Sequence, residues 1–310
     1  MIMPLPERTP PSRPASAAGR TQLQAGDRLY SYRLEERIGA GGFGTVWKAR
    51  HAEKPDCVRA IKVANRPGDL CALQTEAAAL RRLAHPHLVR LHAVNLHHGF
   101  PHLVMEYIDG KNLRRTALEE GLLPPLDAVC VALQVCSALK FLHASGLIHR
   151  DVKPENILLR RTAPPEPRSR RPLYEAKLSD FGLARRSRPS DSTILLSRAS
   201  GRGSGRAPQG TILYMSPEQR QGQPAVDPRA DLFSLGVVLY EMLAGELPLG
   251  MDAPSDLNPA IPPELDRVCR RALHQDRDRR FRDAAEMESA LRHAARALSG
   301  AGEGEDRVLS

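Results

Sequence analysis

The run IHRDVKPENIL at residues 148–158 constrains this chain more than any other stretch. It places a carboxylate, Asp151, and an amide, Asn156, on one predicted loop. Transfer of a phosphoryl group needs a carboxylate that orients the attacking hydroxyl and receives its proton, with an oxygen ligand for magnesium close by. These two side chains supply both groups. The run therefore predicts a loop that carries phosphoryl-transfer chemistry.

A glycine-rich run, GAGGFGTV at residues 39–46, precedes this loop. The pattern fits both a dinucleotide-binding fingerprint and a loop that covers nucleotide phosphates. A dinucleotide-binding loop must open a helix, whereas the residues that follow here alternate and are β-branched or aromatic. We therefore expect the loop to join two strands. On this motif alone, a structural turn without a ligand is the alternative.

Three charged residues complete the pattern. Lys62 lies in the middle of an apolar strand, where an ammonium group is costly unless it is paired. Glu76, on the next predicted helix, is the expected partner, because a Lys–Glu pair of this kind orients the phosphates of ATP. An ordinary edge-strand lysine is the alternative. Asp180, in the run LSDFG at residues 178–182, is a second carboxylate suited to holding a metal ion against phosphates.

Hydrophobic periodicity divides the chain into a β-rich first part and a helical second part. Strands are predicted at residues 32–38, 45–50, 58–63, 88–94 and 102–107, with one helix at 70–84 among them. Further helices are predicted at residues 126–144, 232–244, 264–274 and 284–298. The pattern indicates an α+β fold with two lobes and a ligand-binding cleft between them.

The lobe boundary is expected at the turn signal Asp109-Gly110. The small β-rich N-lobe would span about residues 28–108 and the larger helical C-lobe about 109–298. Residues 1–27 and 299–310 have the composition of disordered tails.

Together these motifs resemble those of eukaryotic-type serine/threonine protein kinases, and most of all the bacterial members of that superfamily. The similarity covers roughly residues 32–298 and includes three structural features. The run YMSPEQ at residues 214–219 is similar to the end of the activation segment. Asp231, in the run DLFSLG, matches the residue that anchors the catalytic loop, and Arg280 matches the arginine that pairs with Glu218.

The resemblance implies a role for each catalytic residue. Asp151 would be the catalytic base, Lys153 would contact the γ-phosphate, and Lys62 would pair with Glu76. Mg²⁺ would be held by Asn156 and Asp180. The ATP site would be formed by Ile38, Gly39, Ala40, Gly41, Gly42, Phe43, Gly44, Thr45, Val46, Ala60, Lys62, Met105, Glu106, Ile108 and Leu158.

Two further sets of residues follow from the same resemblance. Leu80, Leu91, His149 and Phe181 match a stacked apolar column that is complete only in active kinases. Autophosphorylation is expected in the activation loop, where Ser200 and Ser204 are favoured among the hydroxyls at residues 187–204. Thr211 resembles a structural threonine that bonds to the catalytic Asp and Lys.

The resemblance implies a protein kinase that phosphorylates serine and threonine, because Lys153 in its position favours these over tyrosine. A pseudokinase, which would bind ATP as a scaffold and transfer nothing, is the alternative. The insertion at residues 162–172 and the short stretch at 248–262 depart from the family pattern. Because both lie near substrate-selecting surfaces, substrate preference does not carry over from the family.

The net charge of +9 does not indicate nucleic acid as a partner. Residues 160–171 carry five Arg against Glu166, a net charge of +4. Residues 185–206 carry six Arg against Asp191, a net charge of +5, so these two loops account for the whole net charge of the chain. With aromatic residues at only 4%, neither loop has the composition of a base-stacking surface. We expect acidic protein substrates to be attracted, and self-association to support autophosphorylation in trans.

The five cysteines include no C-x-x-C pair, so neither disulfides nor a zinc site is expected. Prolines near the N-terminus interrupt any secretory signal, and the longest apolar stretches contain charged residues, so no membrane span is expected. A cytoplasmic location fits these features.

Overall fold

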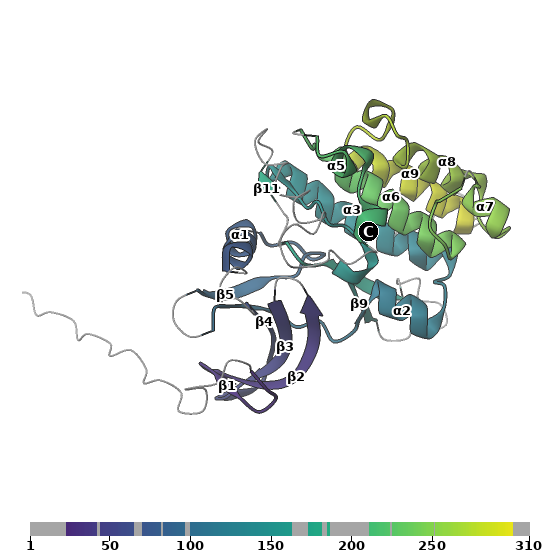
Figure 1. The fold of residues 1–310 in the computed structure, drawn as a ribbon. Helices are drawn as coiled ribbons and strands as arrows, with labels where there is room; N and C mark the ends of the chain where they lie inside the picture. Colours follow the sequence, from purple (N-terminus) through teal and green to yellow (C-terminus); the bar gives the residue numbers. More distant parts are fainter. Residues whose placement is uncertain are drawn as a thin grey trace, which may run out of the picture.

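The N-lobe is built on a six-stranded antiparallel sheet in a computed structural model of the chain (Figure 1). The structure describes residues 23–41, 44–64, 70–81, 83–96, 100–162, 173–181, 185–186, 211–223, 225–250 and 252–299. The strand order is β1-β2-β3-β4-β6-β5. The strands are β1 (Arg28–Leu29), β2 (Tyr32–Gly41), β3 (Gly44–His51), β4 (Lys54–Val63), β5 (Leu91–Asn95) and β6 (His102–Glu106).

One helix, α1 (Leu70–Leu80), packs against this sheet. Its apolar residues Leu73 and Ala77 are buried together with Ala60 and Met105 from the central strands β4 and β6. Alternation of side chains along β4 puts Lys62 on the same side of the sheet as Ala60. The helix and the sheet therefore hold the Lys62 side chain within reach of α1.

The C-lobe is mainly helical, and its core lies around α3 (Pro125–Ala144) and α6 (Arg229–Ala244), whose residues are mostly buried. α8 crosses α6 so closely that a Cβ atom at Gly236 would lie 2.6 Å from the Cβ of Ala272. The other helices are α2 (Leu113–Glu120), α5 (Pro217–Arg220), α7 (Pro254–Leu257), α8 (Pro263–Ala272) and α9 (Ala284–Ser299).

Short strands cover the side of the C-lobe that faces the N-lobe (Figure 1). They form a three-stranded sheet in the order β10-β9-β7 and a pair of β11 with β8. Their bounds are β7 (Lys111–Asn112), β8 (Leu147–Ile148), β9 (Ile157–Arg161), β10 (Tyr174–Leu178) and β11 (Arg185–Arg186). Single 3₁₀ turns are found at Pro154–Asn156, Thr211–Tyr214 and Arg277–Arg279. These strands place the catalytic loop at the boundary between the lobes.

The predicted α+β, two-lobed fold is confirmed, but several boundaries differ. The predicted helix at 70–84 ends at Leu80, and the strand predicted from Leu88 begins at Leu91. Leu88 instead forms an isolated parallel bridge with Leu178, which joins the lobes. The short helices α2 and α7 and the small strands of the C-lobe were not predicted, because each is too short to show a period.

The predicted N-terminal tail is too long. Leu23 packs against the outer N-lobe cluster, and Asp27, which is buried, accepts hydrogen bonds from Gln24 and Leu34. The folded part therefore begins before residue 28. Residues 1–22 and 300–310 lie outside the described residues.

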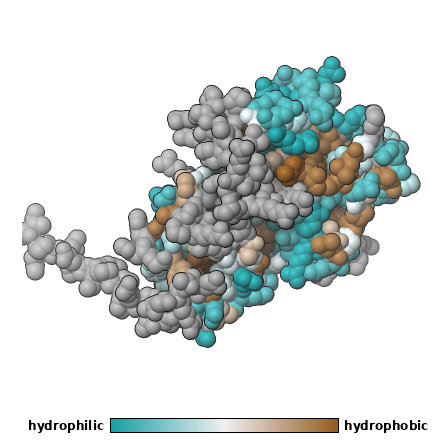
Figure 2. Space-filling view, in the orientation of Figure 1, coloured by the Kyte–Doolittle hydropathy of each residue, from teal (hydrophilic) through white to brown (hydrophobic). Residues whose placement is uncertain are grey.

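Most of the described surface in Figure 2 is hydrophilic, and hydrophobic side chains appear on it as separate patches. Among the described helices, only α3 is long and apolar enough to cross a membrane. Sixty-one per cent of the apolar part of α3 is buried inside the protein, as is usual for the core helix of a folded domain.

Candidate active site

The catalytic loop is anchored by one buried carboxylate. Asp231, in the first turn of α6, accepts hydrogen bonds from the backbone N–H groups of His149 at 2.9 Å and Arg150 at 2.8 Å. It also contacts Nε2 of His143 at 2.8 Å. Burial alone would raise the pKa of Asp231, but these hydrogen bonds outweigh it, so the pKa is lowered and the carboxylate stays ionised. The loop is thereby fixed to α6, a helix whose residues are mostly buried.

Asp151 sits in this loop between a cation and an amide. Its Oδ2 accepts hydrogen bonds from Lys153 Nζ at 2.9 Å and Asn156 Nδ2 at 3.0 Å, and Nδ2 also donates to the Asp151 carbonyl at 2.8 Å. Burial raises the pKa of Asp151, and Lys153 offsets only part of this effect. The arrangement holds one carboxylate in a fixed direction with raised proton affinity, as a general base requires.

Lys62 joins the two lobes through two carboxylates. Its Nζ lies 2.7 Å from Glu76 Oε2 on α1 and 2.7 Å from Asp180 Oδ1, which follows β10. Burial alone would lower the pKa of Lys62, but the charges of Asp180 and then Glu76 outweigh it, so the pKa is raised. The acidic partner expected from the sequence is thus in contact, and Asp180 is a second one.

The Asp180 segment is held close to the catalytic loop. Ser179 donates its backbone N–H to the Asn156 carbonyl at 2.8 Å, and its carbonyl contacts His149 Nε2 at 3.1 Å. Asp180 itself adopts a left-handed backbone with φ of 66°. Since such a backbone is costly for a residue other than glycine, these surrounding bonds must hold it in place.

The predicted apolar column is assembled from both lobes. Phe181 is fully buried, and its ring lies 5.0 Å from that of His149. Leu80 of α1 is buried in the same cluster, and Leu91 of β5 packs against it. Leu80, Leu91 and Phe181 therefore belong to one core cluster, and Phe181 connects it to His149 of the catalytic loop.

The residues predicted to surround the adenine form one cluster. Ala60 and Met105 are paired across β4 and β6 and are buried with Ile108, while Val46 and Leu158 pack against them. Glu106, the other predicted adenine contact, ends β6 beside Met105. This cluster has members from both lobes, which is the composition expected for the walls of an adenine site.

The glycine-rich run forms the end of the β2–β3 hairpin, as the sequence predicts. Gly39 is paired with Val46 and Ala40 with Thr45, while Gly41 is paired with Gly44. A Cβ at Gly44 would lie 2.4 Å from the Val63 carbonyl oxygen, so only glycine fits there without a shift. Ile38 is 44% exposed on β2. Gly42 and Phe43 lie outside the described residues.

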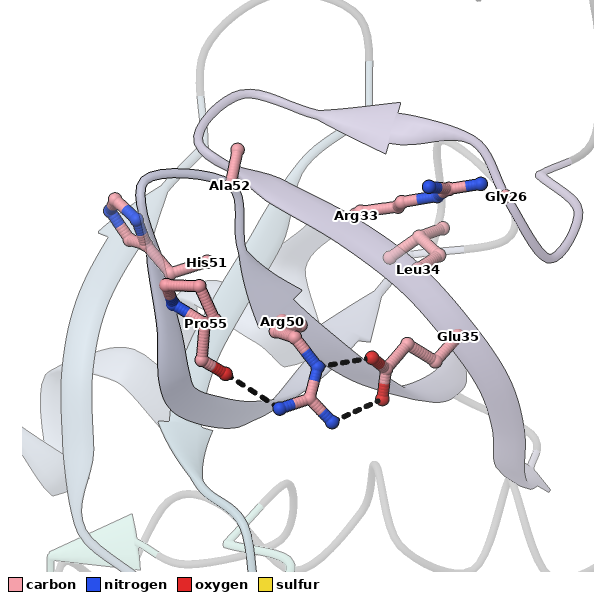
Figure 3. Close-up of a pocket in the computed structure, with 8 residues that line it drawn as sticks. All are labelled: Gly26, Arg33, Leu34, Glu35, Arg50, His51, Ala52 and Pro55. Carbon is pink, nitrogen blue, oxygen red and sulfur yellow. Dashed lines mark hydrogen bonds and ion pairs between the residues drawn. The ribbon is translucent and has the colours of Figure 1, made fainter.

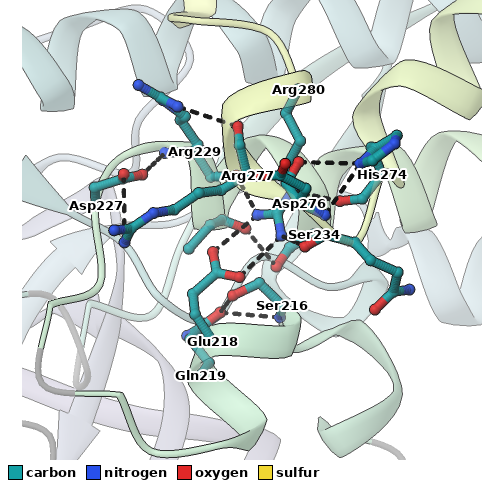
Figure 4. Close-up of polar contacts among 12 residues, drawn as sticks. Ser216, Glu218, Gln219, Asp227, Arg229, Ser234, His274, Asp276, Arg277 and Arg280 are labelled. Atoms are coloured by element: carbon teal, nitrogen blue, oxygen red, sulfur yellow. Dashed lines mark hydrogen bonds and ion pairs between the residues drawn. The ribbon is translucent and has the colours of Figure 1, made fainter.

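A second buried ion pair fixes residues 214–219, the peptide-positioning segment, which would hold a substrate peptide. Arg280 donates to both carboxylate oxygens of Glu218, at 2.8 and 2.9 Å, and to the carbonyls of His274 and Gln275 (Figure 4). Burial alone would raise the pKa of Glu218, but the hydrogen bonds from Arg280 outweigh it, and the pKa is lowered. The expected pairing of these two residues is present.

Sequence reasoning missed Arg114 of α2. Its guanidinium contacts Glu155 at 3.1 Å, Glu241 at 2.5 Å and the hydroxyl of Tyr214, which itself donates to Glu241 at 2.6 Å. One side chain thus links α2, the catalytic loop, the peptide-positioning segment and α6. These partners are up to 127 residues away along the chain, so no local pattern could have indicated the contact.

Several predicted positions fall outside the described residues. These are Gly182, the favoured phosphorylation sites Ser200 and Ser204 with the rest of residues 187–204, and the side chain of Thr211. A cavity of about 450 Å³ lies elsewhere, against β2 and β3 of the N-lobe, where Arg50 is paired with Glu35 (Figure 3). None of the residues predicted to be catalytic lines it, so polar contacts rather than cavity size indicate the candidate site.

Comparison with known proteins agrees with this geometry. A family model described as "Protein kinase domain" matches residues 32–293. "Serine/threonine-protein kinase PknB" of Mycobacterium leprae (strain TN) is 35% identical over 283 residues, covering 84% of this chain and 42% of the relative. "Probable serine/threonine-protein kinase CPE1738" of Clostridium perfringens (strain 13 / Type A) is 32% identical over 276 residues, covering 83% of this chain and 37% of the relative. The chain therefore spans about two fifths of the length of these relatives.

Proposed function

The chain belongs to the protein kinase domain family, and on this premise we propose that it is a serine/threonine protein kinase that transfers the γ-phosphoryl group of ATP to protein hydroxyls. The observation that carries the proposal is the convergence of three carboxylates and two lysines. Asp151 is held by Lys153, while Lys62 contacts both Glu76 and Asp180, the latter 118 residues away along the chain. The comparisons give no support to the alternative of an ATP-binding scaffold.

The donor set at the site fits Mg²⁺. Asn156 uses only its Nδ2 group to hold Asp151, which leaves the amide oxygen for a cation. Asp180 uses Oδ1 for Lys62, and its side chain is 39% exposed. The described residues hold no cluster of three His, Cys, Asp or Glu side chains that could bind a metal alone. This suits Mg²⁺, which in nucleotide sites is bound by one or two protein oxygens together with substrate phosphates.

The residues of the chain would then divide the work of transfer. Asn156 and Asp180 would hold Mg²⁺, and the bound ion would neutralise the charge of the phosphates. Asp151 would orient the substrate hydroxyl and receive its proton, and the neighbouring Lys153 would face the transferred group. Lys62 would hold the α- and β-phosphates, with Glu76 fixing its direction.

Selection of serine and threonine is supported by Lys153 and by the names of both relatives. We further propose protein substrates, autophosphorylation in trans through self-association, and no role for nucleic acid. A cytoplasmic site of action is supported by the five cysteines, all of which are free.

The test is transfer of label from [γ-³²P]ATP and Mg²⁺ to the protein itself and to a generic protein substrate. Asp151→Asn should lower the rate by about 10²- to 10⁴-fold, the range for losing a general base. ATP binding should persist. Asp56→Asn, the same change at an exposed position on β4, should label like the wild type. Equal labelling by Asp151→Asn and wild type would refute the assigned base, and a wild type that binds ATP but never labels would favour the scaffold.

A further inference from the structure

Gln219 is a buried side chain whose amide is used at both ends. It lies in α5, at the end of the peptide-positioning segment, and is 6% exposed. Oε1 accepts hydrogen bonds from the backbone N–H of Ser216 at 3.2 Å and from its hydroxyl at 3.1 Å. Nε2 donates to the carbonyl oxygen of Arg150 at 3.0 Å. Because one end faces two donors and the other faces an acceptor, only one orientation of the amide satisfies all three partners.

Arg150 is the residue directly before Asp151, and its backbone is in an unfavourable conformation. Its φ is 67°, in the left-handed region that residues other than glycine rarely adopt. Asp231 fixes the N–H of Arg150, and Gln219 fixes its carbonyl. That carbonyl belongs to the peptide bond between Arg150 and Asp151, so the orientation of this peptide determines where the Asp151 side chain begins.

The neighbouring residue Glu218 forms its ion pair with a different part of the chain. Glu218 binds Arg280, 62 residues further on, whereas Gln219 binds Arg150, 69 residues back. Figure 4 shows the side chains of Glu218 and Gln219 on the same short helix, with Ser216 just before it. α5 is therefore attached on one side to the C-lobe scaffold and on the other to the catalytic loop.

We propose that Gln219 is a positioning residue for phosphoryl transfer, through which the peptide-positioning segment sets the orientation of the Arg150–Asp151 peptide. The inference rests on the proposed function and adds a requirement to it. The base is correctly placed only when α5 is docked, so order in the segment that receives the substrate peptide and order in the catalytic loop are coupled. An amide is needed because the position must accept from Ser216 and donate to Arg150 at once.

The first test compares Gln219→Met with Gln221→Met. Methionine keeps the approximate volume but neither accepts nor donates here, whereas Gln221 is exposed two residues later. We expect Q219M to lower kcat by about 10- to 100-fold, the effect of leaving a buried carbonyl unpaired next to the base. KM for MgATP should stay within about threefold of wild type, because the nucleotide contacts are elsewhere. Q221M should match the wild type.

The second test uses Gln219→Glu and pH. The ionised carboxylate of this variant would repel the Arg150 carbonyl, whereas the protonated acid could donate to it through its O–H. The activity of Q219E relative to wild type should therefore rise as the pH is lowered from 8 to 6. Ser216→Ala removes one donor to Oε1 and leaves the bond to Arg150, so its loss should be smaller than that of Q219M and independent of pH.

The outcomes separate this inference from the proposed function. Q219M with the kcat of Q221M, or a Q219E ratio that is flat with pH, would overturn the positioning role while transfer by the wild type stands. A loss of kcat accompanied by a loss of ATP affinity of the same factor and by a lower melting temperature would also overturn it, because that pattern indicates general misfolding. A wild type without transfer would overturn the proposed function and the inference with it.

Discussion

Two buried ion pairs, one in each lobe, are built in opposite ways. In the C-lobe, Arg280 is fully buried and uses its guanidinium for both oxygens of Glu218 and for the backbone carbonyls of His274 and Gln275. In the N-lobe, Lys62 divides a single ammonium group between Glu76 and Asp180. Among the described residues, Oε1 of Glu76 accepts no hydrogen bond although it is buried.

The difference appears in the proton affinities. The pKa of Glu218 is lowered, because the hydrogen bonds from Arg280 outweigh the effect of burial. The pKa of Glu76 is raised, because the effect of burial outweighs the attraction and the hydrogen bond of Lys62. Lys62 has a raised pKa because it faces two anions, whereas Glu76 receives only part of one cation and also lies near the charge of Asp180. Asp180 keeps a lowered pKa, because Lys153 and His149 act on it in addition to Lys62. The C-lobe pair is saturated and suits a permanent joint, while the N-lobe trio keeps unused capacity for a ligand.

The largest expected effect comes from breaking the saturated pair. Arg280→Met should lower the free energy of unfolding by about 3–5 kcal/mol, because it leaves the Glu218 carboxylate buried without a partner. Urea unfolding measures this change. Arg279→Met, at the adjacent and 73% exposed position, is the matched control and should be close to neutral. A loss as small as that of the control would show that the C-lobe pair is not a structural joint.

Lys62→Met should instead lower activity strongly and stability only slightly. Removing the ammonium group takes away the charged contact to the phosphates that we propose for Lys62, which is expected to lower kcat/KM by about 10²- to 10³-fold. Stability should change much less than for Arg280→Met, because Asp180 is partly exposed and Glu76 can take up a proton. Lys54→Met, at the exposed end of the same strand, is the control. A destabilisation as large as that of Arg280→Met would remove the distinction between the two pairs.

The same contrast explains what the sequence could and could not predict. Lys62, Asp151 and Asp180 stand in short runs whose chemistry is readable locally, and the partner of Lys62 followed from the cost of burying an ammonium group in a strand. The contacts of Arg114 and Gln219 were missed because their partners come from distant segments. Gln219 stands in the run YMSPEQ, but that run does not show which residue its amide contacts. The predicted tail was too long because Leu23 is a single apolar residue in a polar context, which periodicity does not register.

The smallest effect, and the most direct comparison of the two pairs, is expected on mild acidification. The pKa of Glu76 in the folded state is raised above its unfolded value of 4.5, so the folded protein takes up this proton first as the pH falls towards 4.5. Protonation then removes the anion that orients Lys62, without any cost in stability from that group. The pKa of Glu218 is lowered, so the stability that this residue contributes is present above 4.5 and is lost only as the pH falls through its lower folded value.

As the pH is lowered from 7 towards 4.5, activity should therefore fall while the urea midpoint stays nearly constant. Asp151 also has a raised pKa and would lower activity in the same direction, so Glu76→Gln separates the two contributions. At pH 7, Glu76→Gln should be less active than the wild type. Its remaining loss of activity on acidification should come from protonation of Asp151 alone. If the urea midpoint falls in parallel with activity, the N-lobe pair is as structural as the C-lobe pair, and the proposed division between a permanent joint and a ligand-ready site is wrong.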